Sequence, residues 1–352
     1  MANLTETAYL TRKIIKLGTF SLITILLIRE IVSAGIHYWK IKHPPPPPPP
    51  TLCFGKIPAI KFPKTEQNPP FYPRLETIDG NFPAFPLTAK VYFIPQKTSN
   101  LFTWERAKNW AKQMNFTGEP EKPDEFTFIY KTKSFPQTTL KLDVLSGNFT
   151  LTYDYQSDLT LVGTKNILNK NQVIEEARSF LQRSGVFPPD LAEGSQEVIL
   201  FKFNPPDLQP ALAISEADIA LVNFFRKDLE GIKILPPNPK KSLVSVLLSG
   251  SPDQQKRILE VNYTHFPISE DNYCTYPLLK VEQAWKDLQS NKAFLASFGQ
   301  NYDGQVVIRK IYLAYFDPPD EQRFLEPVYV FEGDRDFLAY IPALDPKFTL
   351  NE

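Results

Sequence analysis

The sequence predicts an α+β protein in which an N-terminal transmembrane helix precedes about three degenerate units, each a helix packed on an antiparallel sheet. Three observations support this prediction: one long apolar segment near the N-terminus, three amphipathic helix patterns, and alternating apolar and polar runs around them. Hydrophobic residues make up 42% of the 352 residues and aromatic residues 13%, which is enough to fill a core. Helices that cover one face of antiparallel sheets define the α+β class.

The apolar segment runs from Ile14 to Ile36, and its stretch Leu17–Ile28 contains no charged residue. Its 23 residues exceed a ~30 Å hydrocarbon core at ~1.5 Å per helical residue. Arg12, Lys13 and Lys16 precede the uncharged stretch, and Lys40 and Lys42 follow the segment, a weak bias that favours a cytoplasmic N-terminus. We therefore expect residues 1–43 to form a cytoplasmic tail and a single-pass anchor in the plasma membrane, with the C-terminal domain extracytoplasmic.

Two charged residues, Arg29 and Glu30, interrupt the apolar segment. An Arg at the centre of a membrane helix costs ~2.5–3.5 kcal/mol, but Arg29 lies beyond the midpoint and its long side chain can reach the outer interface. Alternatively, Arg29 and Glu30 pair with polar groups of a partner transmembrane helix, while Ser33 and Gly35 allow close approach. These four residues are the candidate partner contact.

A cleaved signal peptide is the competing interpretation of the same segment. Leu17–Ile28 has the length of a signal-peptide core, and Val32-Ser33-Ala34 matches a cleavage site. The Arg29-Glu30 interruption and the aromatic residues at Tyr38 and Trp39 argue against cleavage. The sequence leaves both interpretations open.

Residues 44–87 are predicted to be a proline-rich linker and a lead-in to the domain. Pro44–Pro50 is an unbroken proline run, which favours polyproline II and gives a stiff spacer of roughly 20 Å. Cys53 lies in this linker and Cys274 in the domain, so a bridge between them is possible. Two cysteines at this spacing imply neither a disulfide framework nor a metal site.

Three helix patterns stand out in the domain, and each contains a Glu-x-Ala motif with a bulky apolar residue three or four places after the alanine. Each pattern places apolar residues on one stripe. Gly185 is expected to end the second helix, because glycine readily adopts the left-handed conformation found there. The expected helices are Thr103–Met114, Asn171–Ser184 and Val281–Ala293.

Runs of alternating apolar and polar residues surround each helix and predict antiparallel strands. The repeated order of helix and strands predicts three units, at residues 88–165, 166–275 and 276–352. The expected strands are 89–94, 126–131, 138–155 with a turn at 146–148, 196–203, 242–249, 257–266, 306–315, 326–331 and 337–342.

The second and third helices with their strands, and the closing hairpin over Pro327–Pro342, resemble the PepSY-type unit. They also resemble the YycH and YycI regulators, single-pass bacterial proteins whose extracytoplasmic domains restrain a sensor kinase. The whole chain is similar to uncharacterised single-pass membrane proteins of candidate-phyla bacteria. The resemblance covers most of residues 88–345 and implies a regulatory or inhibitory interaction domain. It carries over no functional residue, because these families have no well-marked catalytic motif.

We expect no catalytic, cofactor-binding or metal-binding residue, because the chain contains no Gly-x-Ser-x-Gly, P-loop, His-Glu-x-x-His or Cys-x-x-Cys motif. His265 is the one histidine of the domain, and a structural role is expected for it. Carboxylates are abundant, so hydrolysis by a carboxylate pair remains an alternative. The acidic clusters at Asp317–Glu321 and Glu332–Asp336 are expected to be polar loops, with a weak calcium site as the alternative.

Lys plus Arg and Asp plus Glu both number 39, so the formal net charge is zero and we expect no nucleic-acid partner. The anchor, the spacer and the missing catalytic motifs favour a non-enzymatic extracytoplasmic domain that binds an envelope protein and regulates or scaffolds it. The alternatives are an envelope hydrolase that uses paired carboxylates and a structural envelope component. The sequence indicates neither the identity of a partner nor the oligomeric state.

Overall fold

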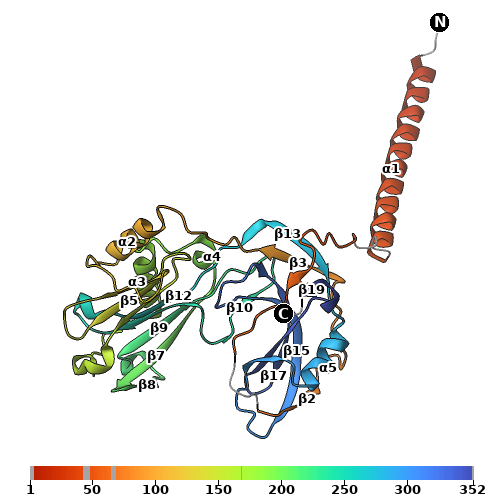
Figure 1. The fold of residues 1–352 in the computed structure, drawn as a ribbon. Helices are drawn as coiled ribbons and strands as arrows, with labels where there is room; N and C mark the ends of the chain where they lie inside the picture. The colour runs from red at the N-terminus through yellow and green to blue at the C-terminus, as the bar shows by residue number, and fades with distance from the viewer. Residues whose placement is uncertain (1–3, 43–47, 65–68, 168, 351–352) are drawn as a thin grey trace. The chain divides into compact units, whose positions relative to one another are not determined.

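Figure 1 shows the computed structural model, which describes residues 4–42, 48–64, 69–167 and 169–350. The chain divides into two units, Met1–Pro49 and Pro50–Glu352. The predicted α+β class is confirmed, because one apolar helix is followed by a domain of mainly antiparallel sheets with helices packed on them.

The first unit is built on α1, which runs from Leu4 to Lys42 as one helix. Its segment Thr7–Trp39 is long and apolar enough to cross a membrane, with a mean hydropathy of 1.7. Hydroxyl groups within it donate back to the helix: Thr24 Oγ1 donates to the carbonyl of Phe20 at 2.8 Å. Such bonds let polar side chains sit in an apolar segment without an unpaired donor. The predicted spacer Pro44–Pro50 lies mostly outside the described residues.

The second unit contains one large sheet of eight antiparallel strands in the order β4-β5-β6-β12-β11-β9-β7-β8. Strand alternation turns Leu140 and Leu142 inward and leaves Lys141 exposed. Helices α2 (Thr103–Gln113) and α3 (Lys170–Arg183) cover the apolar face of this sheet. We call this sheet with α2, α3 and α4 (Pro189–Ala192) the large-sheet region. Its strands are β4 (Thr127–Lys131), β5 (Thr138–Asp143), β6 (Phe149–Tyr153), β7 (Gln196–Asn204), β8 (Asp207–Pro210), β9 (Ile219–Phe224), β11 (Val244–Ser249) and β12 (Ile258–Tyr263).

The rest of the unit, the small-sheet region, contains three smaller sheets and α5 (Val281–Gln289). A six-stranded sheet has the path β10-β15-β17-β18-β14, with β2 paired parallel to β15; the others are β13-β3-β16 and β1-β19. Helix α5 packs on β18 and β2. The strands are β1 (Ile57–Pro58), β2 (Tyr72–Leu75), β3 (Thr88–Phe93), β10 (Ile234–Leu235), β13 (Ser269–Pro277), β14 (Phe294–Ser297), β15 (Gln305–Phe316), β16 (Phe324–Leu325), β17 (Pro327–Gly333), β18 (Phe337–Pro342) and β19 (Thr349–Leu350).

The lead-in before β3 is part of the small-sheet region rather than a surface addition. Cys53 forms a disulfide with Cys274 of β13. Ile57 is fully buried in β1, and Phe62 stacks on Phe294 with ring centroids 4.8 Å apart. The lead-in therefore contributes strands and core side chains to this region alone, as its aromatic residues show.

The three predicted helices are present, and each Glu-x-Ala motif places its alanine, Ala107, Ala177 or Ala284, fully buried against a sheet. The third helix ends at Gln289, four residues earlier than predicted, because Asn291 adopts a positive φ and the Lys292 amide bonds back to Asp287. The unit boundaries at 88–165, 166–275 and 276–352 stay predictions. In the structure α2 and α3 share one sheet, which crosses the boundary between residues 165 and 166.

Candidate functional site

Four ionisable side chains from separate segments meet where the large-sheet and small-sheet regions join. Asp190 lies on α4 and Arg226 follows β9; His265 follows β12 and Asp317 follows β15. Arg226 donates from Nε to Asp190 Oδ2 at 2.9 Å and from Nη1 to Asp317 Oδ1 at 3.1 Å. His265 Nε2 lies 2.9 Å from Asp190 Oδ2. We call these four residues the charged joint, a buried ion-pair network in which only 4% of the Arg226 side chain is exposed.

The pKa values of the two carboxylates in the charged joint shift in opposite directions, although burial raises both of them. Burial alone would raise the pKa of Asp190, but its hydrogen bond with His265 and the Arg226 charge outweigh burial and lower that pKa to about 2. At Asp317, burial outweighs the attraction of Arg226 and raises the pKa. Opposed shifts are typical of acid–base pairs. Here, however, Arg226 bonds to both carboxylates, and the adjoining cavity of about 360 Å³ is lined by Asp190 but not, within the described ranges, by Asp317.

The two acidic clusters differ from each other in the structure. Asp317 lies in the loop after β15, as expected, but it is only 7% exposed and accepts a hydrogen bond from Arg226 in the charged joint. In the other cluster, Asp334 pairs with Arg309 and Glu332 with Lys310 at the surface. Among the residues that the structure describes, no group of three or more His, Cys, Asp or Glu side chains could hold a metal ion.

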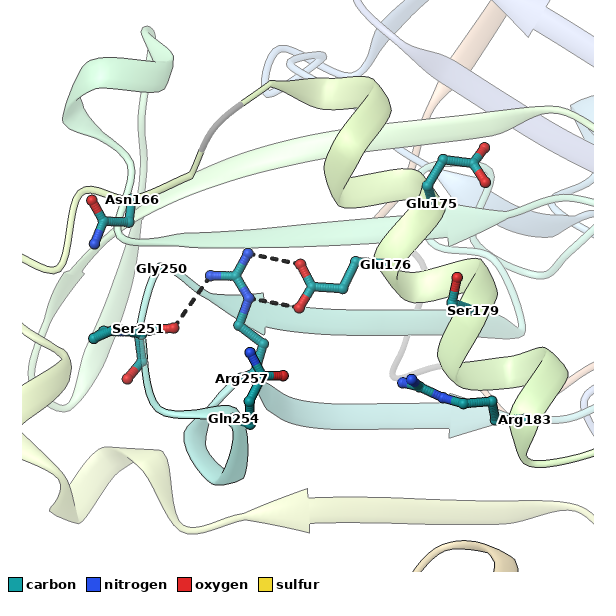
Figure 2. Close-up of a pocket in the computed structure, with 10 residues that line it drawn as sticks. Asn166, Glu175, Glu176, Ser179, Arg183, Gly250, Ser251, Gln254 and Arg257 are labelled. Atoms are coloured by element: carbon teal, nitrogen blue, oxygen red, sulfur yellow. Dashed lines mark hydrogen bonds and ion pairs between the residues drawn. The ribbon is translucent and has the colours of Figure 1, made fainter.

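A second candidate site lies beside α3 in the large-sheet region. Two hollows of about 540 and 600 Å³ share four lining residues, so they form one continuous feature that we call the α3 groove. Figure 2 shows the first hollow, with Glu176, Ser179 and Arg183 projecting from α3 toward the loop before β12. The shared residues are Glu176, Arg183, Gln254 and Arg257.

An arginine–carboxylate pair holds the middle of the α3 groove. Arg257 donates from Nε and Nη2 to the two carboxylate oxygens of Glu176 at 2.6 and 2.7 Å (Figure 2). Its Nη1 also donates to the Ser249 carbonyl at 2.6 Å. Such a two-bond pair is geometrically specific and fixes both side chains. The pair therefore joins α3 to the residue before β12 and holds the middle of the groove in one conformation.

The deeper hollow of the α3 groove combines an apolar floor with a polar rim. Leu151 and Tyr153 of β6 form the floor, and Phe135, 80% exposed, stands at the edge. On the rim, Lys256 pairs with Asp158 at 2.8 Å. Concave sites with an apolar floor and a few fixed polar groups are typical of ligand or peptide binding.

The residues predicted to contact a partner helix lie on α1. Arg29, Glu30, Ser33 and Gly35 are all exposed in the first unit, and Ser33 Oγ donates to the Glu30 carbonyl at 3.0 Å. A Cβ at Gly35 would meet no atom within 4 Å. Their role as a partner contact stays a prediction.

The residues of the charged joint and the α3 groove were not singled out from the sequence, except His265 and Asp317. Glu176 and Arg257 are 81 positions apart, and Arg226 and Asp317 are 91 apart. No local pattern links such pairs, because pairing is set by strand order in the sheets. The available signals were the single domain histidine and the acidic cluster Asp317–Glu321.

Comparison with known proteins assigns no family: no protein-family model matches the chain, and no curated protein sequence matches it. One similar solved structure is the C-terminal domain of Bacillus megaterium YpeB, with a TM-score of 0.31 and 14% identity, covering 71% of this chain and 94% of that chain. Another is an uncharacterised protein from Eubacterium rectale ATCC 33656, with a TM-score of 0.31 and 12% identity, covering 73% and 82%. Likeness at this level carries no argument about function, and the resemblances to PepSY-type, YycH, YycI and candidate-phyla proteins stay predictions.

Proposed function

We propose that this chain is a single-pass protein of the plasma membrane whose domain, Pro50–Glu352, lies outside the cytoplasm and binds a protein of the cell envelope, regulating or scaffolding it without catalysis. The observation that carries the proposal is α1. Its large apolar side chains, such as Ile14, Phe20 and Ile31, are more than two-thirds exposed. Each such side chain favours an apolar environment over water by roughly 1.5–3 kcal/mol, so a lipid bilayer is the environment that suits this helix.

The disulfide supports the proposed orientation. Cys53 lies a few residues after the proline run, and its bridge to Cys274 closes the lead-in onto β13. Disulfides persist in oxidising compartments and are rare in the cytosol. The basic residues before α1's apolar segment favour the same orientation.

The state of the charged groups supports binding rather than catalysis. His265 is bonded to Asp190, and Asp190 and Asp317 are both held by Arg226. A catalytic acid must reach its substrate, whereas Asp317 is buried behind Arg226. The α3 groove, by contrast, is open and combines apolar and polar groups, as a protein-binding surface does.

Protease protection tests the topology. Intact spheroplasts carrying the full chain with a tag at each end are treated with protease. We expect the domain and C-terminal tag to be digested and the N-terminal tag to be protected; thiol alkylation without reductant should leave Cys53 and Cys274 unlabelled. A C-terminal tag that resists protease until lysis, or an intact chain recovered in the soluble fraction without detergent, contradicts the proposal.

Site-specific crosslinking tests the binding role. A photo-crosslinking residue at Gln254, on the groove rim, should trap one reproducible envelope protein in intact cells, and less of it once the anchor is removed. The matched control is Thr152, an exposed residue of β6 whose neighbours Leu151 and Tyr153 point to the groove on the opposite face. Equal trapping at both positions, or none at Gln254, contradicts a binding role for the groove.

A further inference from the structure

The floor of the α3 groove is shaped for apolar side chains. Met114 and Phe116, at the end of α2, and Leu151 of β6 line the 600 Å³ hollow and are each less than 10% exposed. Phe180 of α3 and Ile258 of β12 line it too. A hollow of this size accepts one or two large side chains, and burying them there would provide most of the binding free energy.

Within the described residues, each cation around the groove is paired with a carboxylate, with one exception. Arg257 is held by Glu176 and Lys256 by Asp158, while Glu175 is held by Arg178. Asp253 turns back to its own loop, where its Oδ1 accepts from the amide of Gln255 at 3.0 Å.

Arg183 is the exception. It lines both hollows, and no hydrogen bond or ion pair to its guanidinium is found within the described part of the chain. In Figure 2 its side chain extends from α3 toward the segment that carries Gln254 and Arg257. Arg183 is therefore the lining cation without a carboxylate partner in the described residues, and it complements a carboxylate of a ligand, which a guanidinium can bind through two hydrogen bonds.

Uncharged donors on the rim favour a peptide over a lipid. The side-chain amides of Asn115, Gln254 and Gln255 are exposed along the 600 Å³ hollow, and the structure records no partner for them among its described residues. A peptide backbone presents a donor and an acceptor at each residue and uses such amides, whereas an acyl chain has no polar group along its length.

Resting on the proposed function, we propose that the α3 groove binds an extended segment of the partner protein in which a large apolar side chain stands next to an Asp or Glu. The apolar side chain fills the hollow over Leu151. The carboxylate binds Arg183, and the rim amides bond to the segment's backbone. This assigns the groove a partner chemistry that crosslinking alone does not identify.

Peptide selection with charge reversal tests this assignment. The full chain in nanodiscs is used to select from a displayed library of random 12-residue peptides, with Arg183→Glu and Lys170→Glu as matched variants. Lys170 lies at the other end of α3, is exposed, and undergoes the same change of charge. We expect wild type and Lys170→Glu to enrich the same apolar–acidic pairs. Arg183→Glu should bind those peptides at least about tenfold more weakly, the loss of one charge-assisted contact, and enrich apolar–basic pairs instead.

Arg183→Gln checks that the reversal acts through charge and not through misfolding: it should weaken the selected acidic peptides without enriching basic ones. Enrichment without acidic residues, or identical enrichment in wild type and Arg183→Glu, overturns the proposal. So does Arg183-dependent binding of phosphatidylglycerol vesicles with no enriched peptide, which would make the ligand a lipid. A negative selection alongside successful crosslinking at Gln254 would overturn the assigned chemistry and leave the proposed function standing.

Discussion

The two regions of the domain differ in whether the lead-in contributes strands and core side chains to them. The small-sheet region is finished by the lead-in, which adds β1 and β2, the Cys53–Cys274 disulfide and aromatic side chains such as Phe62. No described residue of the lead-in belongs to the core of the large-sheet region, which has the two hollows of the α3 groove. The segment that follows α1 is therefore built into one region, while the proposed binding surface belongs to the other.

Within this one unit, attachment to the lead-in and the α3 groove therefore belong to different regions. The small-sheet region is tied covalently to the chain that leaves the membrane, and the large-sheet region is joined to it through the charged joint and short connections. Substitutions in either region, in the charged joint and in α1 separate these contributions.

Substitution of Arg226 is expected to have the largest effect. Arg226→Met leaves Asp190 and Asp317 without their shared cation, and breaking a buried ion pair costs about 3–5 kcal/mol. Urea unfolding measures the loss, and hydrogen exchange should show β9 and β17 opening at different free energies once the joint is broken. The control is Arg309→Met, since Arg309 also holds two carboxylates, Glu76 and Asp334, but at the surface; about 0–1 kcal/mol is expected. Equal losses would remove the distinction between the joint and the surface.

Loss of the disulfide should come next and act on one region. The paired substitution Cys53→Ser/Cys274→Ser opens a loop with a sequence separation of 221, for which about 2–4 kcal/mol is typical. Exchange protection should fall in β3 and β13, which the bridge holds near the lead-in, and change little in β6 and β12. An equal fall in the large-sheet region would contradict the independence of the two regions.

Glu326 should make the stability of the small-sheet region fall as the pH rises. Burial raises the pKa of Glu326 well above its ordinary value, so the folded state keeps this proton after the unfolded chain has released it. Stability should therefore fall as the pH rises above about 4.5 toward the folded-state pKa. Glu326→Gln should remove that slope in urea unfolding between pH 5 and 8. Glu332→Gln, a half-exposed change on β17, is the control and should leave the slope unchanged.

Asp190 should make the stability of the large-sheet region fall as the pH falls, the opposite direction. Its folded-state pKa of about 2 lies below its ordinary value of 3.8, because His265 and Arg226 outweigh the effect of burial. The ionised form therefore stabilises the fold above pH 4, and this contribution is lost as the pH falls from about 4 to about 2. Asp190→Asn should abolish this part of the acid transition. A full acid transition in the variant would show that other carboxylates produce it.

The smallest effect on the domain is expected from the anchor. Replacing Arg29 and Glu30 by Leu should leave urea unfolding of both regions unchanged, because these residues lie on α1 in the other unit. If the two charges contact a partner helix, the same variant should lose a co-purified membrane protein. Unchanged co-purification would favour the alternative in which Arg29 reaches the lipid interface.

Much of the fold could be predicted because its signals are local. Thr103–Gln113 and Lys170–Arg183 were recognisable from a helical apolar stripe, and Gly185, with a φ of +70°, ends the second helix as expected. The strand β9 was missed because it lies in the middle of the large sheet and is apolar on both faces, so it shows no alternation. All of β13 was missed, because its first half is polar and exposed and only its last residues alternate between buried and half-buried.

The amino-acid sequence by itself determined the properties that depend on neighbouring residues: an apolar helix long enough for a bilayer, the helices with buried alanines, and the α+β class. The tertiary structure decided the Cys53–Cys274 bridge, the burial of Asp317 and the pairing of Glu176 with Arg257. Those contacts join residues scores of positions apart, and the order of strands in the sheets brings them together. No periodicity along the chain records that order, because it follows from which strand edges pair when the core closes.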